Sequence, residues 1–184
     1  ASPLIDQGRV IVPLGLRVDA DGKAEGASLV AFDALTGTTL WKKGAHQASY
    51  ASPMICTLDG VRQIVIVCES EVCGHDADSG EQLWEYAWAG SSSGNASCSQ
   101  PVVVGTNQLF VSKGYAHGSA LIEISRGDAD SWTVNELGHH LTVMKTKFTN
   151  VALYDGHVYG LDDSVLSCVD VQTGRRRWKR GRYG

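Results

Sequence analysis

The chain has 184 residues, of which 43% are apolar and 20% are charged, and its formal net charge is −4. This length permits a domain with a substantial core and excludes a disulfide-held miniprotein. No apolar run reaches the roughly 18 residues of a membrane-spanning helix, and the modest acidic balance argues against nucleic-acid binding. The 21 glycines favour short strands joined by tight turns, so the composition predicts an all-β fold.

Each quarter of the chain contains apolar segments separated by turn residues. Gln7-Gly8 in the first quarter and Asp155-Gly156 in the last are typical of two-residue hairpin turns between strands. The same order of four strands, A to D, repeats along the chain with no strand left over. We therefore expect a single domain of residues 1–184, with four units at about 2–44, 52–88, 99–137 and 149–181.

A motif closes each unit. Three copies read Asp-x-x-Thr/Ser-Gly-x-x-x-Trp, whereas the copy in the third unit has Ile124 and Asp128 in place of the aspartate and glycine but keeps a tryptophan at the same offset. Successive tryptophans are separated by roughly 45 residues, the length of one β-propeller blade. The motif residues are Asp33, Gly37, Trp41, Asp76, Gly80, Trp84, Trp132, Asp170, Gly174 and Trp178.

The residue types of the motif have a physical explanation. Aspartate and the hydroxyl residue accept backbone N–H hydrogen bonds in a turn, and glycine supplies a positive φ, so the chain reverses there. The tryptophan that follows is placed to pack flat on the neighbouring blade, where it buries a large area. We predict that the motif residues dock one blade onto the next.

The segment Ala31–Trp41 resembles the tryptophan-docking motif of the pyrroloquinoline-quinone-like (PQQ-like) β-propeller repeat family, and the likeness covers essentially the whole chain. That family includes eight-bladed quinoprotein dehydrogenases and an eight-bladed outer-membrane assembly lipoprotein. The resemblance implies a β-propeller of four-stranded antiparallel blades. Four blades would be half of an eight-bladed ring, which a longer chain or a second copy closing the ring would complete. A closed four-bladed ring is the alternative.

The fold by itself does not decide the activity. For a dehydrogenase, the resemblance implies a central funnel with pyrroloquinoline quinone, a calcium ion and an aspartate base, often with a vicinal Cys-Cys disulfide. This chain has no Cys-Cys pair, and only Trp88 lies outside the docking motifs. The leading prediction is a non-catalytic scaffold, without a cofactor, that binds a protein or a ligand. The alternative is part of a PQQ- and calcium-dependent quinoprotein dehydrogenase.

The sequence gives less direct information about the compartment of the protein and about metal binding than it gives about the fold. Because most relatives work outside the cytoplasm, the resemblance implies a periplasmic or other extracytoplasmic location, although the opening residues lack the features of a signal peptide. The five cysteines have no zinc spacing and leave the redox state open. The adjacent His139 and His140 would point to opposite sides of an extended chain, so we expect no metal site.

Loops between the second and third strands and between successive blades meet on one face of a propeller, where ligands commonly bind. Polar and aromatic residues in these loops are therefore candidates for contact with a ligand or protein partner. The alternative is that the loops are solvated connections whose side chains cap the local backbone. The candidates are His46, Gln47, Tyr50, Glu69, Asn95, Tyr115, His139, Lys147 and Asn150.

Overall fold

The computed structural model describes residues 1–18, 20–21, 24–88 and 96–183. These residues form four antiparallel sheets of four consecutive strands each and one short 3-10 helix. Along the part of the chain that the structure describes, no helix has the length and apolarity needed to cross a membrane. The predicted all-β fold of four-stranded antiparallel blades is confirmed.

The strand bounds follow the four repeat units. The first sheet contains β1 (Leu4–Asp6), β2 (Arg9–Val18), β3 (Ala24–Asp33) and β4 (Thr39–Lys43). The second contains β5 (Met54–Leu58), β6 (Val61–Val67), β7 (Glu71–Asp76) and β8 (Gln82–Ala87). The third contains β9 (Val102–Val104), β10 (Gln108–Lys113), β11 (Gly118–Arg126) and β12 (Trp132–His140). The fourth contains β13 (Ala152–Tyr154), β14 (His157–Asp162), β15 (Val165–Asp170) and β16 (Arg176–Arg180).

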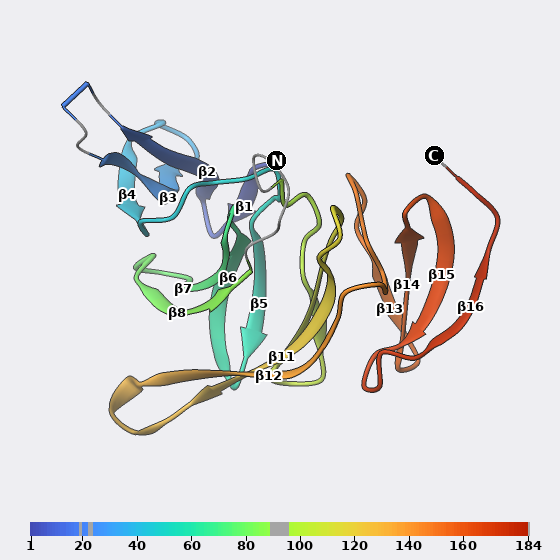
Figure 1. The fold of residues 1–184 in the computed structure, drawn as a ribbon. Coiled ribbons are helices and arrows are strands. Elements are labelled where there is room, and N and C mark those ends of the chain that lie inside the picture. Colours follow the sequence, from blue (N-terminus) through green and yellow to red (C-terminus); the bar gives the residue numbers. More distant parts are fainter. Residues whose placement is uncertain (19, 22–23, 89–95, 184) are drawn as a thin grey trace.

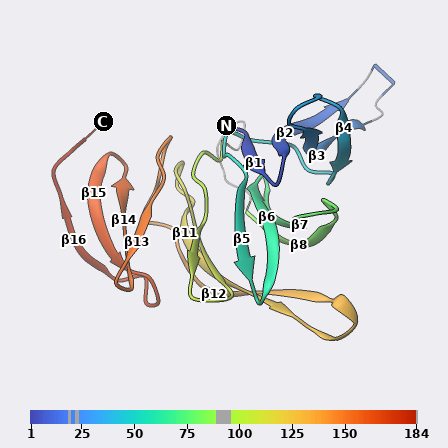
Figure 2. The ribbon, with the colours of Figure 1, turned by 180° about the vertical axis from the view of Figure 1, so that it is seen from behind.

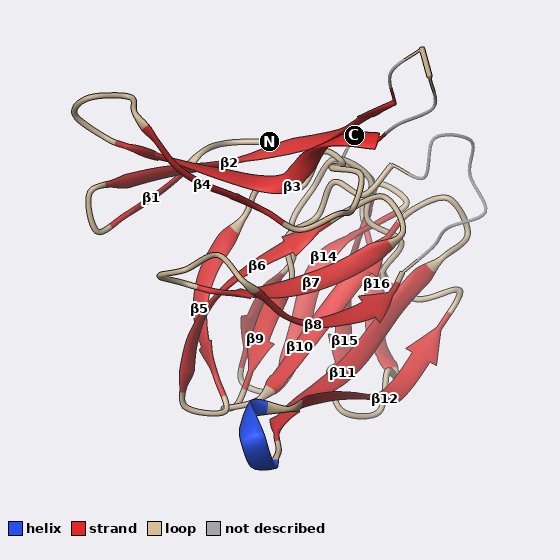
Figure 3. Ribbon diagram, turned by 90° about the vertical axis from the view of Figure 1, so that its left-hand side faces the viewer, coloured by secondary structure: helices blue, strands red, loops and turns tan. Residues whose placement is uncertain are grey.

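The sheets follow one another in chain order along an arc, from β1–β4 at one end to β13–β16 at the other (Figures 1 and 2). The first strands of neighbouring sheets contact each other, β1 with β5 and β9 with β13. The helix η1 (Asp128–Asp130) lies at the tip of the long β11–β12 hairpin, at the opposite end of the molecule from both termini (Figure 3).

The apolar core lies between the sheets. Strand β6 shows the principle: Ile64 and Ile66 belong to the cluster shared with the first sheet, while Val65 and Val67 belong to the cluster shared with the third. All four side chains are at most 2% exposed. A strand buried on both faces needs a continuous apolar run, which is the sequence that β6 has.

The turn between the third and fourth strands has the same hydrogen bonds in three sheets. In the first sheet, Asp33 Oδ1 accepts hydrogen bonds from the Thr36 amide (2.7 Å) and hydroxyl (2.8 Å), and Gly37 takes a φ of +71°. These bonds from Thr36 lower the pKa of Asp33. Asp76 and Asp170 make the equivalent bonds. Local chemistry therefore fixes these three reversals.

Tryptophan and glycine meet across the first sheet boundary. Trp41 lies so close over Gly80 that a Cβ atom there would be 2.7 Å from the indole ring. At the second boundary, Trp84 is 4% exposed, packs in the cluster between the two sheets, and donates its indole N–H to Gln63 Oε1 (2.6 Å). Each ring thus buries a large aromatic surface between neighbouring sheets.

The third sheet places its tryptophan at a different register. In the other sheets one residue bulges from the last strand immediately before the tryptophan, as Leu40 does before Trp41. In the third sheet the bulged residue is Leu137, and Gly138 follows it. Trp132 instead begins β12 and packs against the cluster between the second and third sheets. The predicted offset misplaces Trp132 because the β11–β12 hairpin continues well beyond the bulge before it turns.

A histidine occupies the corresponding place at the third boundary. The imidazole of His140 lies so close over Gly174 that any Cβ atom at this glycine would overlap the ring. Gly174 has a φ of +66°, like the turn glycines of the first two sheets. An aromatic ring over a turn glycine is therefore common to the first and third boundaries, although the ring differs.

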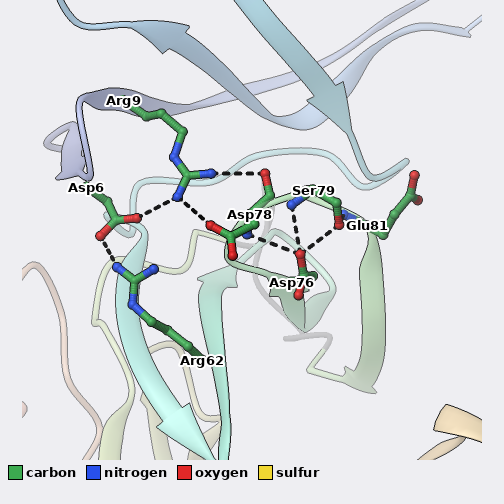
Figure 4. A network of polar contacts seen from close by, with 7 residues as sticks. All are labelled: Asp6, Arg9, Arg62, Asp76, Asp78, Ser79 and Glu81. Carbon is green, nitrogen blue, oxygen red and sulfur yellow. Dashed lines mark hydrogen bonds and ion pairs between the residues drawn. The ribbon is translucent and has the colours of Figure 1, made fainter.

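A network of ion pairs connects the first two sheets at the edge where β1 turns into β2 (Figure 4). Arg9 Nη2 lies 3.0 Å from Asp6 Oδ2 and 2.9 Å from Asp78 Oδ1, and Arg62 pairs with the other oxygen of Asp6. The Asp6 side chain is only 8% exposed. Because a buried charge without its partner is costly, this network fixes how the two sheets align.

We expect Trp84→Ala to lower the free energy of unfolding by about 3–5 kcal/mol, because the ring fills a buried space between sheets. Urea denaturation followed by circular dichroism measures this loss. Leu141→Ala, at a side chain 59% exposed, is the control and should change stability by less than about 0.5 kcal/mol. A loss below about 1 kcal/mol for Trp84→Ala would contradict the packing described here.

Alanine variants of Gly80 and Gly60 distinguish the cost of backbone strain from the cost of disturbing the contact between sheets. Their φ angles are +74° and +77°, but a Cβ atom at Gly60 meets nothing within 4 Å, whereas one at Gly80 meets Trp41. Gly60→Ala should cost about 1–2 kcal/mol from the left-handed backbone alone. Gly80→Ala should cost about 1–3 kcal/mol more, since Trp41 must also move. Equal losses in urea denaturation would show that the tryptophan contact contributes nothing.

Candidate binding face formed by the connecting loops

The order of the strands brings the connections between sheets to one edge of the molecule. Neighbouring strands in each sheet are antiparallel, so the turn between the second and third strands lies at the same edge as the connection to the next sheet. Both termini also lie at this edge (Figure 1). We call this edge the loop face. Its described residues are 1–3, 20–21, 44–53, 68–70, 88, 96–101, 114–117, 141–151, 163–164 and 181–183.

His46 and Gln47 connect the first sheet to the second. The imidazole of His46 lies between two carboxylates, with Nδ1 3.2 Å from Glu71 Oε2 and Nε2 2.9 Å from Glu85 Oε2. Gln47 Oε1 accepts a hydrogen bond from the Leu16 amide (3.0 Å). These two candidates are therefore engaged in contacts within the protein.

Glu69 takes part in the link to the third sheet through its backbone. Its amide donates to the Gln47 carbonyl (2.9 Å), and its own carbonyl accepts a hydrogen bond from Lys113 Nζ (3.1 Å). Lys113 is 1% exposed, and burial lowers the pKa of its ammonium group. This lysine was not among the predicted residues, because a lysine in a strand gives no sign in the sequence that it will be buried.

Tyr115, in the turn between β10 and β11, lies close to Lys147, in the connection between the third and fourth sheets. Lys147 Nζ lies 5.6 Å from the centre of the Tyr115 ring and 3.0 Å from Asp163 Oδ1. Tyr50 belongs to another part of the loop face, where its side chain is 64% exposed and its amide donates to the Ser97 carbonyl (3.0 Å). The loop face thus presents tyrosine and lysine side chains to solvent.

His139 belongs to a separate cluster on the outer strand β12. Its ring centre lies 5.5 Å from that of Trp88 and 5.2 Å from that of His117, and its Nε2 is 3.0 Å from the His117 carbonyl. Burial, together with the charge of His139, lowers the pKa of His117 to about 4. Among the described residues, the buried Trp88 indole N–H has no hydrogen-bond partner.

Asn150 belongs to a row of polar residues that precede the first strands of the sheets. The Ser2 amide donates to Ser52 Oγ (2.6 Å), the Gln100 side chain donates to the Ser52 carbonyl (3.2 Å), and the Gln100 amide donates to Asn150 Oδ1 (2.9 Å). A polar residue before proline recurs at Ser2, Ser52 and Gln100, a repeated signal that the motif analysis missed. Asn95 lies outside the described residues.

A groove of about 280 Å³ opens on the loop face beside the fourth sheet. Two exposed aromatic side chains border it, Phe148 at 73% and Tyr183 at 62% exposure. Phe148 has a φ of +56°, a conformation uncommon for a residue with a side chain. The groove is lined by Lys147, Phe148, Thr149, Leu161, Ser164 and Tyr183. Sequence analysis identified only Lys147 of this set.

A buried carboxylate organises the basic residues next to the groove. The Asp162 side chain is fully buried, and its Oδ2 lies 2.8 Å from Arg176 Nη2 and 2.9 Å from Lys179 Nζ. Its Oδ1 accepts a hydrogen bond from the Lys145 amide (3.1 Å). Burial alone would raise the pKa of Asp162, but the bonds from Lys179 and Lys145 and their charges outweigh it and lower the pKa.

Within the described ranges, no three His, Cys, Asp or Glu side chains come together in a way that could hold a metal ion. His46, the candidate side chain best suited to acid–base chemistry at neutral pH, is paired with Glu71 and Glu85. The arrangement presents exposed aromatic and cationic groups, which suit recognition of another molecule.

Four consecutive sheets, aromatic rings over turn glycines and a shared loop face define the class: a β-propeller built from PQQ-like repeats. Residues 1–180 match the family model described as outer membrane protein assembly factor BamB, and the chain belongs to this family.

One solved relative supports the fold. The crystal structure of BamB from Moraxella catarrhalis superimposes with a TM-score of 0.57 at 16% sequence identity, covering 95% of this chain and 50% of that chain. The chain thus spans about half the length of this relative. No curated protein matches the sequence.

Asp162→Asn should lower the free energy of unfolding at neutral pH by about 3 kcal/mol, because Arg176 and Lys179 would lose the charge that they surround. The folded pKa of Asp162 is lowered, so its contribution is present above the unfolded pKa of about 4 and is lost as the pH falls below that value. Urea denaturation at several pH values measures this. Asp163→Asn, at a carboxylate 37% exposed, is the control and should cost under about 1 kcal/mol. Equal effects would contradict the difference in burial.

Proposed function

We propose that this chain is a non-catalytic PQQ-like propeller module that binds another protein on its loop face. The observation that carries the proposal is the groove bordered by Phe148 and Tyr183, with Lys147 and Tyr115 beside it. Large aromatic side chains are enriched where proteins bind each other, because they supply contact area at little cost in conformational entropy. A side chain that is mostly exposed, such as Phe148, gains most from being covered.

The same residues give little support to the alternative, part of a quinoprotein dehydrogenase. That activity needs carboxylate and amide ligands for calcium, together with a general base positioned for proton transfer. Among the described candidates, His46 bridges Glu71 and Glu85, and Asn150 bonds to Gln100. Groups held in this way connect one sheet to the next, which favours a scaffold that acts without a cofactor.

The family description supports a role in assembly and a location outside the cytoplasm. It names an outer membrane protein assembly factor, and the solved relative is the BamB protein of Moraxella catarrhalis. We infer for this chain a periplasmic scaffold whose loop face takes a protein partner.

Crosslinking tests the loop face directly. A photoreactive residue at Tyr50 or Tyr115 should form a crosslink to one and the same protein in extracts of the source cells. The double variant Phe148→Ser, Tyr183→Ser should lose at least about 80% of that product, as expected when the central contacts are removed. Leu137→Ser, at a side chain 48% exposed on the outer strand β12, should keep it. Equal yields from all three proteins would contradict the proposed face.

Titration with pyrroloquinoline quinone and Ca²⁺ tests the enzyme alternative. The tryptophan fluorescence and the thermal midpoint should stay unchanged at saturating cofactor, because the described residues bring no three His, Cys, Asp or Glu side chains together around a metal ion. A ligand that binds only the folded state would raise the midpoint, and the rise would grow with the logarithm of the ratio of its concentration to Kd. A saturable quench together with a raised midpoint would favour the dehydrogenase.

A further inference from the structure

A continuous series of ion pairs begins on the loop face where the third sheet joins the fourth. Lys147 Nζ is 3.0 Å from Asp163 Oδ1, and Lys145 Nζ pairs with the other oxygen of Asp163. Lys145 Nζ also lies 3.8 Å from Asp162 Oδ1. Through Asp162 the series reaches two cations of strand β16, Arg176 and Lys179. We call these six residues the basic network.

The basic network has more positive than negative charge. Four cationic side chains share two carboxylates, which leaves a net charge of +2. The hydrogen bond between Lys145 and Asp163 lowers the pKa of Asp163 and raises the pKa of Lys145, so both groups stay charged at neutral pH. At the first boundary the arrangement is the reverse, since two carboxylates, Glu71 and Glu85, share His46. The charge beside the loop face therefore changes sign between the first boundary and the third.

The distribution of charge along the sequence agrees with this difference. Residues 141–184 contain eight basic and four acidic residues, whereas residues 1–140 contain eight basic and sixteen acidic residues. The electric field of such a protein attracts an anionic group toward the fourth sheet and repels it from the other three. An approaching acidic partner is therefore steered to the side of the molecule that carries the basic network.

Lys147 joins the basic network to the groove on the loop face. Its side chain is 45% exposed and lines that groove of about 280 Å³, together with Phe148 and Tyr183. An ammonium group has three N–H donors, so the pairing of Lys147 with Asp163 leaves donors for a carboxylate from outside. The groove thus combines aromatic surface, which an apolar side chain can cover, with a cation that can bind an anion.

The backbone around Phe148 is held in an uncommon conformation. Phe148 has its φ of +56° in the connection between β12 and β13 rather than in a hairpin turn. The left-handed region is costly for a bulky residue, and such strain concentrates at functional sites. The residues that follow are anchored, since the Thr149 carbonyl accepts a hydrogen bond from Ser99 Oγ and Asn150 Oδ1 accepts one from the Gln100 amide. These bonds fix the backbone that presents Phe148, which limits the entropy lost when a partner covers the ring.

We propose that the protein partner enters this groove with an acidic segment, a stretch in which aspartate or glutamate flanks an apolar side chain. This partner class rests on the proposed function of the loop face. The apolar side chain covers Phe148 and Tyr183, and the carboxylates bind Lys147 and the excess positive charge of the basic network. A groove accepts single side chains of a protein, whereas a flat membrane surface would meet only its border.

Fluorescence anisotropy with designed peptides tests this chemistry. The acidic probe is a short fluorescent peptide in which aspartate and glutamate flank one phenylalanine, and its matched control replaces each acidic residue by the corresponding amide. The acidic probe should bind at least about fivefold more tightly at low salt, and the difference should shrink as NaCl screens the charges. Phe148→Ser should weaken the binding of both peptides. Equal affinity for the two peptides, or no binding of either, would overturn the proposal.

Charge reversal separates the role of Lys147 from a general loss of structure. Lys147→Glu should weaken binding of the acidic probe at least about tenfold and should tighten binding of a peptide with lysines in place of its acidic residues. A variant that failed to fold would gain no affinity for the basic peptide. The matched control is Lys43→Glu, since Lys43 is 33% exposed and also pairs with a carboxylate, but at the first boundary. This control should leave both affinities unchanged, and the same loss in both variants would contradict the proposed site.

Two further measurements identify the source of the negative charge and isolate the proposed function. The protein should not sediment with phosphatidylglycerol vesicles, and sedimentation that Lys147→Glu abolishes would assign the groove to an anionic membrane and overturn the acidic segment. A protein crosslink from Tyr50 or Tyr115 that persists at full yield in Lys147→Glu would also refute the acidic segment, but it would leave the proposed function intact. No crosslink from the native chain would instead refute the proposed function.

Discussion

Each inner sheet of this chain has two apolar faces, and burial of both against neighbouring sheets stabilises the whole structure. In β6, Ile64 and Ile66 pack toward one neighbour and Val65 and Val67 toward the other, so neither set can be buried by the sheet alone. Apolar burial has no direction of its own, and sheets held by it alone could slide. The ion network around Asp6 and the ring of Trp41 over Gly80 supply the missing alignment.

This division of roles explains the character of the loop face. Since the sheets carry the core, the loops need only cross from one sheet to the next, and some of their backbone groups bond to one another, as the Glu69 amide does to the Gln47 carbonyl. His46, Gln47 and Asn150 connect neighbouring sheets. Side chains that make no such connection, such as Phe148, extend into solvent and give the face its capacity to bind.

The sheet boundaries show how much variation the fold accepts. An indole lies over Gly80 at the first boundary and an imidazole over Gly174 at the third, while at the second Trp84 is anchored by Gln63. Packing at a sheet boundary therefore requires a flat side chain of suitable size at the right distance from the next sheet. A fold governed by such spacing tolerates wide sequence change, in keeping with 16% identity to a solved relative of the same fold.

The sequence by itself determined the sheets, their order and their number, because the information is local. In three of the four motifs, the carboxylate of Asp33 or its equivalent bonds to a residue only three positions away, and a glycine such as Gly37 supplies the backbone freedom for the turn. Such a turn forms wherever its residues occur together, so counting motifs counted sheets. The all-β class and the repeat family followed from that count.

Only the tertiary structure decided which side chains meet. Trp132 keeps the spacing of its repeat, yet the long β11–β12 hairpin places it away from the position of the other tryptophans. The bond between Gln100 and Asn150 joins residues 50 positions apart, and the groove unites Phe148 with Tyr183 across a whole sheet. Such contacts depend on the combined effect of bulges, strand lengths and sheet packing along the chain. A single added residue shifts the register of a strand and so changes which side chains meet.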